Sequence, residues 1–373
     1  MVCFERIIFS AFVALSTLVE AHPGHDVNAE ASERATALKG KRGLAECSDT
    51  LKIRGFEAKN IARRELAVQK LRRSLAIKKE VPTLEDRDLG SLNTSHHSSL
   101  DVNFDTDPEV LFASNATCIL GPDVTQGPYY VTGELVRENI VEDQTGVPLY
   151  LDIQLVDSST CEPVSGSYVD IWHCNSTGVY SGIVANGNGN SADSSNINTT
   201  FLRGIQQTDD DGVVKFETLF PGHYTSRATH IHVLSHPTNE TTLLANDTIS
   251  GLYTSQASHV GQLFFDQDLI SEVESTSPYT TNTQTLTENS DDSILLQEAD
   301  EIDPFVDYVY LNDDDISDGI FAWISLAIDS SEDTSITPAA YLTASGGVSN
   351  SDSGSGGPGG SGGPGAPGGS GGP

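Results

Sequence analysis

Basic residues are scarce in this chain of 373 residues, which contains 20 Lys and Arg against 53 Asp and Glu and has a formal net charge of −33. Residues 1–100 carry a net charge of +3, whereas residues 101–373 carry −36. Because proteins bind nucleic acid through clustered Lys and Arg that displace counterions, this composition excludes nucleic acid as a partner. The few cations beyond residue 100 are Arg137, Arg203, Lys215 and Arg227.

Long apolar runs are missing as well, since none beyond residue 21 approaches the roughly eighteen residues of a membrane-spanning helix. The chain begins with Arg6, a mainly apolar run from Ile7 to Val19, and then Val-Glu-Ala ending at Ala21. This pattern predicts a secretory signal peptide over residues 1–21, because the run is too short to cross a bilayer. We therefore expect a secreted, extracellular protein with no membrane partner. Six Asn-x-Ser/Thr sequons agree with a glycosylating route, namely Asn93, Asn115, Asn175, Asn198, Asn239 and Asn246.

Cysteine is sparse, and no Cys-x-x-Cys pair occurs, which argues against the common zinc-binding patterns. Removal of the signal peptide would leave Cys47, Cys118, Cys161 and Cys174. An even number in an oxidising compartment predicts two disulfides, for which three pairings exist. We favour Cys161–Cys174 across a hairpin, with Cys47–Cys118 joining the N-terminal segment to the domain; free buried thiols are the alternative.

Composition divides the mature chain into three parts. Residues 22–100 form the only basic stretch, within which Phe56–Lys79 predicts a helix containing dibasic pairs. Two interpretations remain open for this segment: a propeptide that is processed off, or a helical arm packed on the domain. Residues 101–343 are expected to form the globular domain. Residues 344–373 consist largely of Gly, Ser and Pro and predict a disordered tail.

The globular part is predicted to be all-β and to form a β-sandwich, because short alternating runs are separated by Gly, Pro and Asn. The clearest alternation places four apolar residues on one face, namely Leu149, Leu151, Ile153 and Leu155. Ala322–Ile328 predicts a late strand. Asn186–Thr200 and the acidic residues 280–303 are expected to be loops.

A His-x-His pair carries the strongest chemical signal. The period of a strand places His230 and His232 on one face, about 7 Å apart along the chain, where both can reach one metal ion. The pair alone is a weak signal. Two tyrosines precede it, Tyr224 in Pro221-Gly-His-Tyr-Thr-Ser-Arg227 and Tyr180 in Gly178-Val-Tyr.

Further motifs fall in order around this pair. They are Gly127-Pro-Tyr129-Tyr130, Trp172-His-Cys-Asn-x-x-Gly-Val-Tyr180, Leu202-Arg-Gly204, Thr208-Asp-x-x-Gly212 and Gly261-Gln-Leu-Phe-Phe-Asp266. Over roughly residues 120–268 the chain resembles the intradiol ring-cleavage dioxygenases, most of all their secreted fungal branch. The resemblance implies a transthyretin-like (prealbumin-like) β-sandwich core with an N-terminal helical segment.

The resemblance also implies a mononuclear, non-haem Fe(III) held by Tyr180, Tyr224, His230 and His232. Two phenolates are hard anionic donors that stabilise ferric iron, unlike the two-His-one-carboxylate set of Fe(II) enzymes. The implied reaction uses a small catecholic substrate and O₂, with the metal acting as Lewis acid and template. Tyr224 would leave the metal as a base, and the ring would break between its two hydroxylated carbons to give a muconate-type diacid.

Other residues near the motifs have two interpretations each. The resemblance places Arg227 beside the substrate ring, where it would stabilise developing negative charge; an ion pair with a carboxylate is the alternative. Tyr129 and Tyr130 are candidate substrate-binding residues, with core packing as the alternative. His223 and His236 are interpreted as solvent-facing.

Three other functions compete with the dioxygenase. A non-catalytic, transthyretin-like binding or wall-associated module would have lost one or more of the four donors. A copper oxidase could use His22 and His25 at a new N-terminus, but no further histidine completes its brace. A cupin is disfavoured because no Glu follows the His-x-His pair at a short distance.

Overall fold

The computed structural model describes residues 47–77, 95–97, 119–120, 127–236, 241–251, 256–313, 315–332 and 334–351. The predicted signal peptide, Cys118 and most of the predicted tail lie outside the described residues. Within them, no helix has the length and apolar character needed to cross a membrane.

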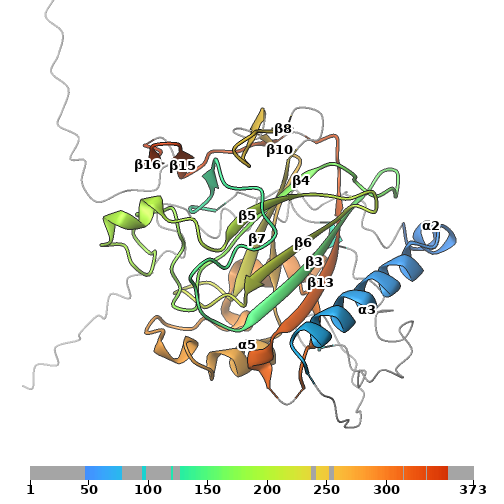
Figure 1. Cartoon of the computed structure of the whole chain (residues 1–373), viewed down its shortest axis with the longest axis horizontal. Coiled ribbons are helices and arrows are strands. Elements are labelled where there is room, and N and C mark those ends of the chain that lie inside the picture. The colour runs from blue at the N-terminus through green and yellow to red at the C-terminus, as the bar shows by residue number, and fades with distance from the viewer. Residues whose placement is uncertain are drawn as a thin grey trace, which may run out of the picture.

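The chain is mostly β-sheet with few helices, as predicted (Figure 1). The first sheet is ordered β1-β13-β3-β6, with β12 pairing to β13. Its strands are β1 (Ile119–Leu120), β3 (Pro148–Asp157), β6 (Val213–Leu219), β12 (Asp307–Tyr310) and β13 (Ile320–Ile328). The second sheet is ordered β11-β7-β4-β5 and is antiparallel throughout. Its strands are β4 (Tyr168–Trp172), β5 (Arg203–Gln207), β7 (His230–His236) and β11 (His259–Phe264).

One hydrophobic core takes side chains from both sheets. The four alternating residues of β3, Leu149, Leu151, Ile153 and Leu155, are all at most 1% exposed. They cluster with Ile171 of β4 and with Ile231 and Val233 of β7. Burying each such side chain contributes about 1.5–3 kcal/mol. The period-2 pattern therefore orients β7, whose opposite face carries the histidines.

The outer face of β3 is covered by a helix. Helix α3 (Phe56–Ser74), preceded by α2 (Ser48–Ile53), lies along the first sheet (Figure 1). Arg63 donates two hydrogen bonds to the fully buried Asp152, from Nε at 3.0 Å and from Nη2 at 2.8 Å. Asn60 donates to Gln154 at 2.7 Å. The predicted helix is confirmed but ends at Ser74. These contacts are those of a packed arm, and proteolytic removal of the segment stays a prediction.

The favoured disulfide pairing is wrong. Cys161 is bonded to Cys47, and Cys174 is a buried free thiol whose Sγ donates to the Gly222 carbonyl at 3.2 Å. Cys161 and Cys174 lie at opposite ends of β4, so an extended strand holds them farther apart than the roughly 7 Å that a disulfide allows between Cα atoms. The observed bond ties the N-terminal helices to the end of β3.

The described chain continues past the predicted start of the tail. Strand β15 (Ala340–Thr343) pairs with β16 (Gly346–Ser349) and with β2 (Val131–Thr132). Composition predicted disorder here because Gly and Ser bury little surface, but a hairpin pairs through backbone groups alone. Two smaller ladders join β8 (Thr241–Leu243) to β9 (Ile249–Gly251) and β10 (Gln256–Ala257) to β14 (Thr334–Ser335).

The acidic stretch 280–303 is not only a loop. It contains helix α6 (Ser293–Glu301) after the turns η5 (Tyr279–Thr281) and η6 (Asn289–Asp291), and α5 (Gln267–Glu274) precedes it. Asp292 caps α6 by accepting from the Ile294 and Leu295 amides. In the described part of the chain, two further short helices are η3 (Ser194–Asn198), within the other predicted loop, and η7 (Ile316–Asp318).

Candidate metal centre

Strand β7 presents His230 and His232 on one face of the second sheet, away from the shared core. Their Nε2 atoms lie 3.2 Å apart, and both side chains are buried. Trp172 pairs with His232 across β4 and β7 and stacks on its ring, with 4.8 Å between ring centroids and 1° between ring planes. The His pair is therefore held against a flat apolar wall.

The hydrogen bond at Nδ1 of His230 identifies Nε2 as the ring nitrogen that faces the other donors. His230 Nδ1 lies 2.6 Å from the Ala228 carbonyl oxygen, which can only accept. Nδ1 therefore carries the proton, and Nε2 presents its lone pair toward His232. A second hydrogen bond of this kind is the usual way in which proteins orient a metal-ligating imidazole.

Two tyrosines from separate loops meet the histidines. The Tyr224 hydroxyl lies 3.2 Å from His230 Nε2. The Tyr180 ring lies 5.5 Å from the Tyr224 ring and 6.1 Å from the His232 ring, measured between centroids. Among the described residues the Tyr180 hydroxyl has no hydrogen-bond partner of normal length, although it is fully buried. A buried hydroxyl in this state is costly unless something else binds it.

The donor atoms of His230, His232 and Tyr224 are spaced to fit a single metal ion, and the Tyr180 ring packs beside them. Metal–nitrogen bonds of about 2.0–2.1 Å place neighbouring donor atoms about 2.9–3.4 Å apart, which brackets the two measured spacings. The described residues hold no cluster of three or more His, Cys, Asp and Glu that could bind a metal. Two imidazoles and two phenols therefore form the candidate donor set, and phenolates favour a hard, highly charged cation.

Burial keeps both phenols neutral when no cation is present. It raises the pKa of Tyr180 and of Tyr224 well above the ordinary value of a phenol. The positive charge of Arg227 lowers the pKa of both groups but does not outweigh burial. Only a cation of higher charge, in direct contact, would ionise them.

Arg227 is fully buried and forms the ion pair that the sequence left as an alternative. Its Nε donates to Asp292 Oδ2 at 2.9 Å, and its Nη2 donates to Gln262 Oε1 at 2.5 Å. The same Asp292 oxygen accepts from the Ala228 amide at 2.8 Å, two residues before His230. Burial alone would raise the pKa of Asp292, but the charge and hydrogen bonds of Arg227 lower it.

Sequence reasoning missed Gln262 and Asp292 as site residues. Gln262 lies in the Gly261–Asp266 motif and pairs with His232 across β7 and β11, so a signal for it was present. Asp292 had none, because it is one of 53 acidic residues and lies 65 positions from Arg227.

The two candidate substrate-binding tyrosines differ in position. Tyr129 lies between the donors and the loop around Asn186, with its ring 4.8 Å from that of Tyr180 and its hydroxyl 3.4 Å from the Asn186 carbonyl. Tyr130 instead packs on Trp172, with 4.9 Å between ring centroids.

Gly127, with φ of +70°, lies so close to His232 that an added Cβ would be 3.0 Å from its Cε1.

Both histidines that were interpreted as solvent-facing are buried, so that interpretation is wrong. His236 is 0% exposed and lies 3.8 Å from the buried Asp170. His223 is 5% exposed and pairs with Glu274 at 2.8 Å. Sequence periodicity does not reveal such partners, which come from other strands and helices.

Comparison with known proteins finds similarity over the part of the chain that carries these residues. A family model described as "Dioxygenase" matches residues 119–271, which contain all four donors. The chain is 33% identical over 108 residues to catechol 1,2-dioxygenase 1 of Acinetobacter lwoffii, covering 28% of this chain and about a third (32%) of that protein's length. It is 31% identical to the solved intradiol ring-cleavage dioxygenase of Tetranychus urticae, over 58% of this chain and 96% of that chain, with a TM-score of 0.46. The solved catechol 1,2-dioxygenase of Pseudomonas arvilla C-1 is 17% identical over 57% and 62% of the two chains, with a TM-score of 0.33.

Proposed function

Because this chain belongs to the intradiol ring-cleavage dioxygenases, we propose that it cleaves catechol-type rings between the two hydroxylated carbons, using O₂ and releasing muconate-type diacids. The observation that carries the proposal is the convergence of two imidazoles and two phenols: His230 Nε2 lies 3.2 Å from both His232 Nε2 and the Tyr224 hydroxyl, and the Tyr180 ring packs beside them. A secreted location and a transthyretin-like sandwich framework belong to the same proposal.

In this proposal Tyr180, Tyr224, His230 and His232 hold one non-haem ferric ion. The bound ion would supply Lewis-acid activation of the catecholate and a template for O₂. The protein contributes a site shielded from bulk water, since every donor side chain is at most 4% exposed. The Nδ1–H of His230, held by the Ala228 carbonyl, keeps its Nε2 available as a donor.

Tyr224 and Arg227 have separate roles. Tyr224 is the base: its phenolate oxygen accepts a substrate hydroxyl proton, and its burial favours the neutral product of that transfer. Arg227 stabilises negative charge that develops on the ring, and Asp292 and Gln262 hold its guanidinium in place. Tyr129, whose ring packs on Tyr180, forms part of the substrate wall.

The rival functions are less well supported. A non-catalytic module would have no need of four converging donors, and all four are present. The copper site would depend on His22 and His25, which lie outside the described residues.

The test is the visible spectrum and iron content of the purified protein after reconstitution with ferric iron. We expect a red tyrosinate-to-iron band that shifts when catechol is added anaerobically. Tyr224→Phe should change this band, whereas the control Tyr341→Phe, at an exposed tyrosine of β15, should not. A colourless protein that takes up no iron would overturn the proposal.

A further inference from the structure

The two donor tyrosines are carried by loops rather than by strands. Tyr180 follows β4 in the segment 175–180, and Tyr224 lies between β6 and β7 in the segment 222–225. No sheet ladder sets the distance between these segments. Backbone packing of Gly178 against His223 and the hydrogen bond from Cys174 Sγ to the Gly222 carbonyl bring the segments together. Gln284 adds side-chain hydrogen bonds to both segments.

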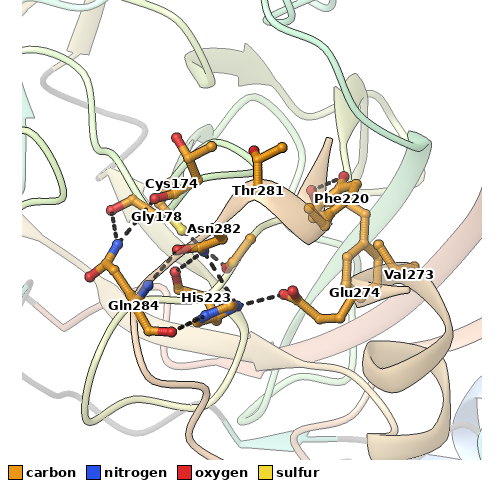
Figure 2. A network of polar contacts seen from close by, with 12 residues as sticks. Cys174, Gly178, Phe220, His223, Val273, Glu274, Thr281, Asn282 and Gln284 are labelled. Atoms are coloured by element: carbon orange, nitrogen blue, oxygen red, sulfur yellow. Dashed lines mark hydrogen bonds and ion pairs between the residues drawn. The ribbon is translucent and has the colours of Figure 1, made fainter. Parts of the chain in front are cut away.

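Gln284 is bonded to both segments at once (Figure 2). Its Nε2 donates to the carbonyls of Thr177 and Gly178 at 3.1 and 3.3 Å. Its Oε1 accepts from the Thr225 amide at 3.4 Å, and its backbone carbonyl accepts from His223 Nε2 at 3.0 Å. The bonded residues lie two or three positions from Tyr180 and immediately on either side of Tyr224.

We propose that Gln284 is a positioning residue that sets the distance and angle between Tyr180 and Tyr224, and thereby the geometry of the bound metal. The inference rests on the proposed function and extends it to a residue outside the dioxygenase match, which ends at residue 271. Gln284 belongs to the acidic stretch that sequence reasoning interpreted as a surface loop.

The side-chain amide of Gln284 fits beside Gly178 and Gly189 because these residues have no Cβ. Gly178 has φ of +78°, and a Cβ there would overlap both Gln284 Nε2 and the His223 carbonyl. A Cβ at Gly189 would lie 3.0 Å from the same Nε2. The two tyrosine segments therefore meet at Gly178 and His223, with the amide of Gln284 inserted at their junction.

Helix α5 contacts the junction through the pair Glu274–His223 (Figure 2). Glu274 of α5 accepts from His223 Nδ1 at 2.8 Å, and Asn282 donates to the His223 carbonyl at 2.8 Å. The backbone N–H of Gln284 in turn donates to Asn282 Oδ1 at 3.1 Å. A helix-backed network of this kind can hold a donor within the fraction of an ångström that catalysis requires.

The test uses Gln284→Met, which keeps the side-chain length and removes the side-chain hydrogen bonds to Thr177, Gly178 and Thr225. The matched control is Gln207→Met, because the exposed Gln207 also donates to a backbone carbonyl, that of Gly166 at 3.1 Å, far from the junction. The first readout is amide hydrogen exchange of the metal-free proteins. We expect exchange in Gln284→Met to rise about tenfold in peptides covering 175–180 and 222–225 together, with neither changed in the control.

The second readout is the ferric band and the rate at which a chelator removes the iron. We expect Gln284→Met to shift the band and to lose iron at least about tenfold faster than wild type and control. Gln284→Glu keeps the acceptor for Thr225 and loses the donor, so its exchange should rise at 175–180 alone. If Gln284→Met has wild-type exchange, band and iron loss, the inference is wrong.

The two proposals fail differently. A wild-type protein that binds no ferric iron defeats the proposed function, and exchange in the metal-free variants still decides whether Gln284 joins the segments. A red wild-type protein whose Gln284→Met variant is indistinguishable defeats this inference alone.

Discussion

Arg203 offers the sharpest test of how the site is held. Its guanidinium is 2% exposed and donates to the Ser181 carbonyl at 2.8 and 3.0 Å and to the Tyr129 carbonyl at 2.8 Å. It also lies 3.3 Å from Glu134, which shares its buried site with Asp170. Burial raises the pKa of both carboxyl groups, and Arg203 is the nearby charge that opposes the rise.

Arg203→Met removes this charge and keeps most of the volume. Removing one partner of a buried ion pair costs about 3–5 kcal/mol, against a total stability of about 5–15 kcal/mol. We expect a loss of about 3–5 kcal/mol in urea unfolding at pH 7, of which the further change Glu134→Gln recovers about 1–2 kcal/mol by removing the stranded carboxyl.

The control for this experiment is Lys70→Met, an exposed position on α3, which should change the unfolding free energy by less than about 0.5 kcal/mol. An Arg203→Met protein that loses less than about 1 kcal/mol would refute the reasoning. So would a double variant less stable than the single one, because the stranded carboxyl would then not be the source of the cost.

Three further predictions concern proton binding, catalysis and modification. Burial raises the pKa of Asp170 to about 8, so the folded protein keeps a proton that the unfolded chain releases near pH 4. The free energy of unfolding should therefore fall as pH rises between about 4 and 8, and Asp170→Asn should flatten that fall in urea midpoints measured at pH 5 and 8. Tyr224→Phe should lower kcat by at least about 100-fold while retaining most of the iron, whereas His230→Ala should lose both iron and activity, as measured by iron assay and turnover. A fully active His230→Ala protein would exclude the donor set. If the protein is secreted, peptide mapping should find a glycan on Asn246, which lies at the exposed tip between β8 and β9. It should find none on Asn175, because the side-chain amide of Asn175 makes the hydrogen bonds that hold the loop before Tyr180. The reverse occupancy would contradict this assignment.

The local part of the site was predictable from the sequence. His230 and His232 share a face because a strand has a period of two, and Ile231 then points into the core. Short-range rules of this kind also predicted the alternation in β3 and the helix beginning at Phe56. They apply because the relevant neighbours are one to four positions away in the chain.

Long-range partners were not predictable, because no pattern within a strand or helix selects them. Asp292 reaches Arg227 across 65 positions, and Cys47 reaches Cys161 across 114. The outer face of β3 carries Asp152, which sequence patterning would assign to solvent, yet α3 buries it from 89 positions away. Each of these contacts depends on where the sheets and helices pack, which the pattern inside one element does not contain.

The charge imbalance of the domain explains which cations it retains. Of the four basic residues beyond position 100, Arg203 and Arg227 are buried, and each neutralises a buried carboxyl group beside a donor segment. Arg137 donates to the Arg203 carbonyl at 2.9 Å, so it supports the same cluster. In a domain of net charge −36, surface carboxylates are solvated and need no partner, whereas buried ones do. Arg227 is already paired with Asp292, so under the proposed function it acts on charge that develops on the ring, and initial attraction of an anionic catecholate would come mainly from the bound metal ion.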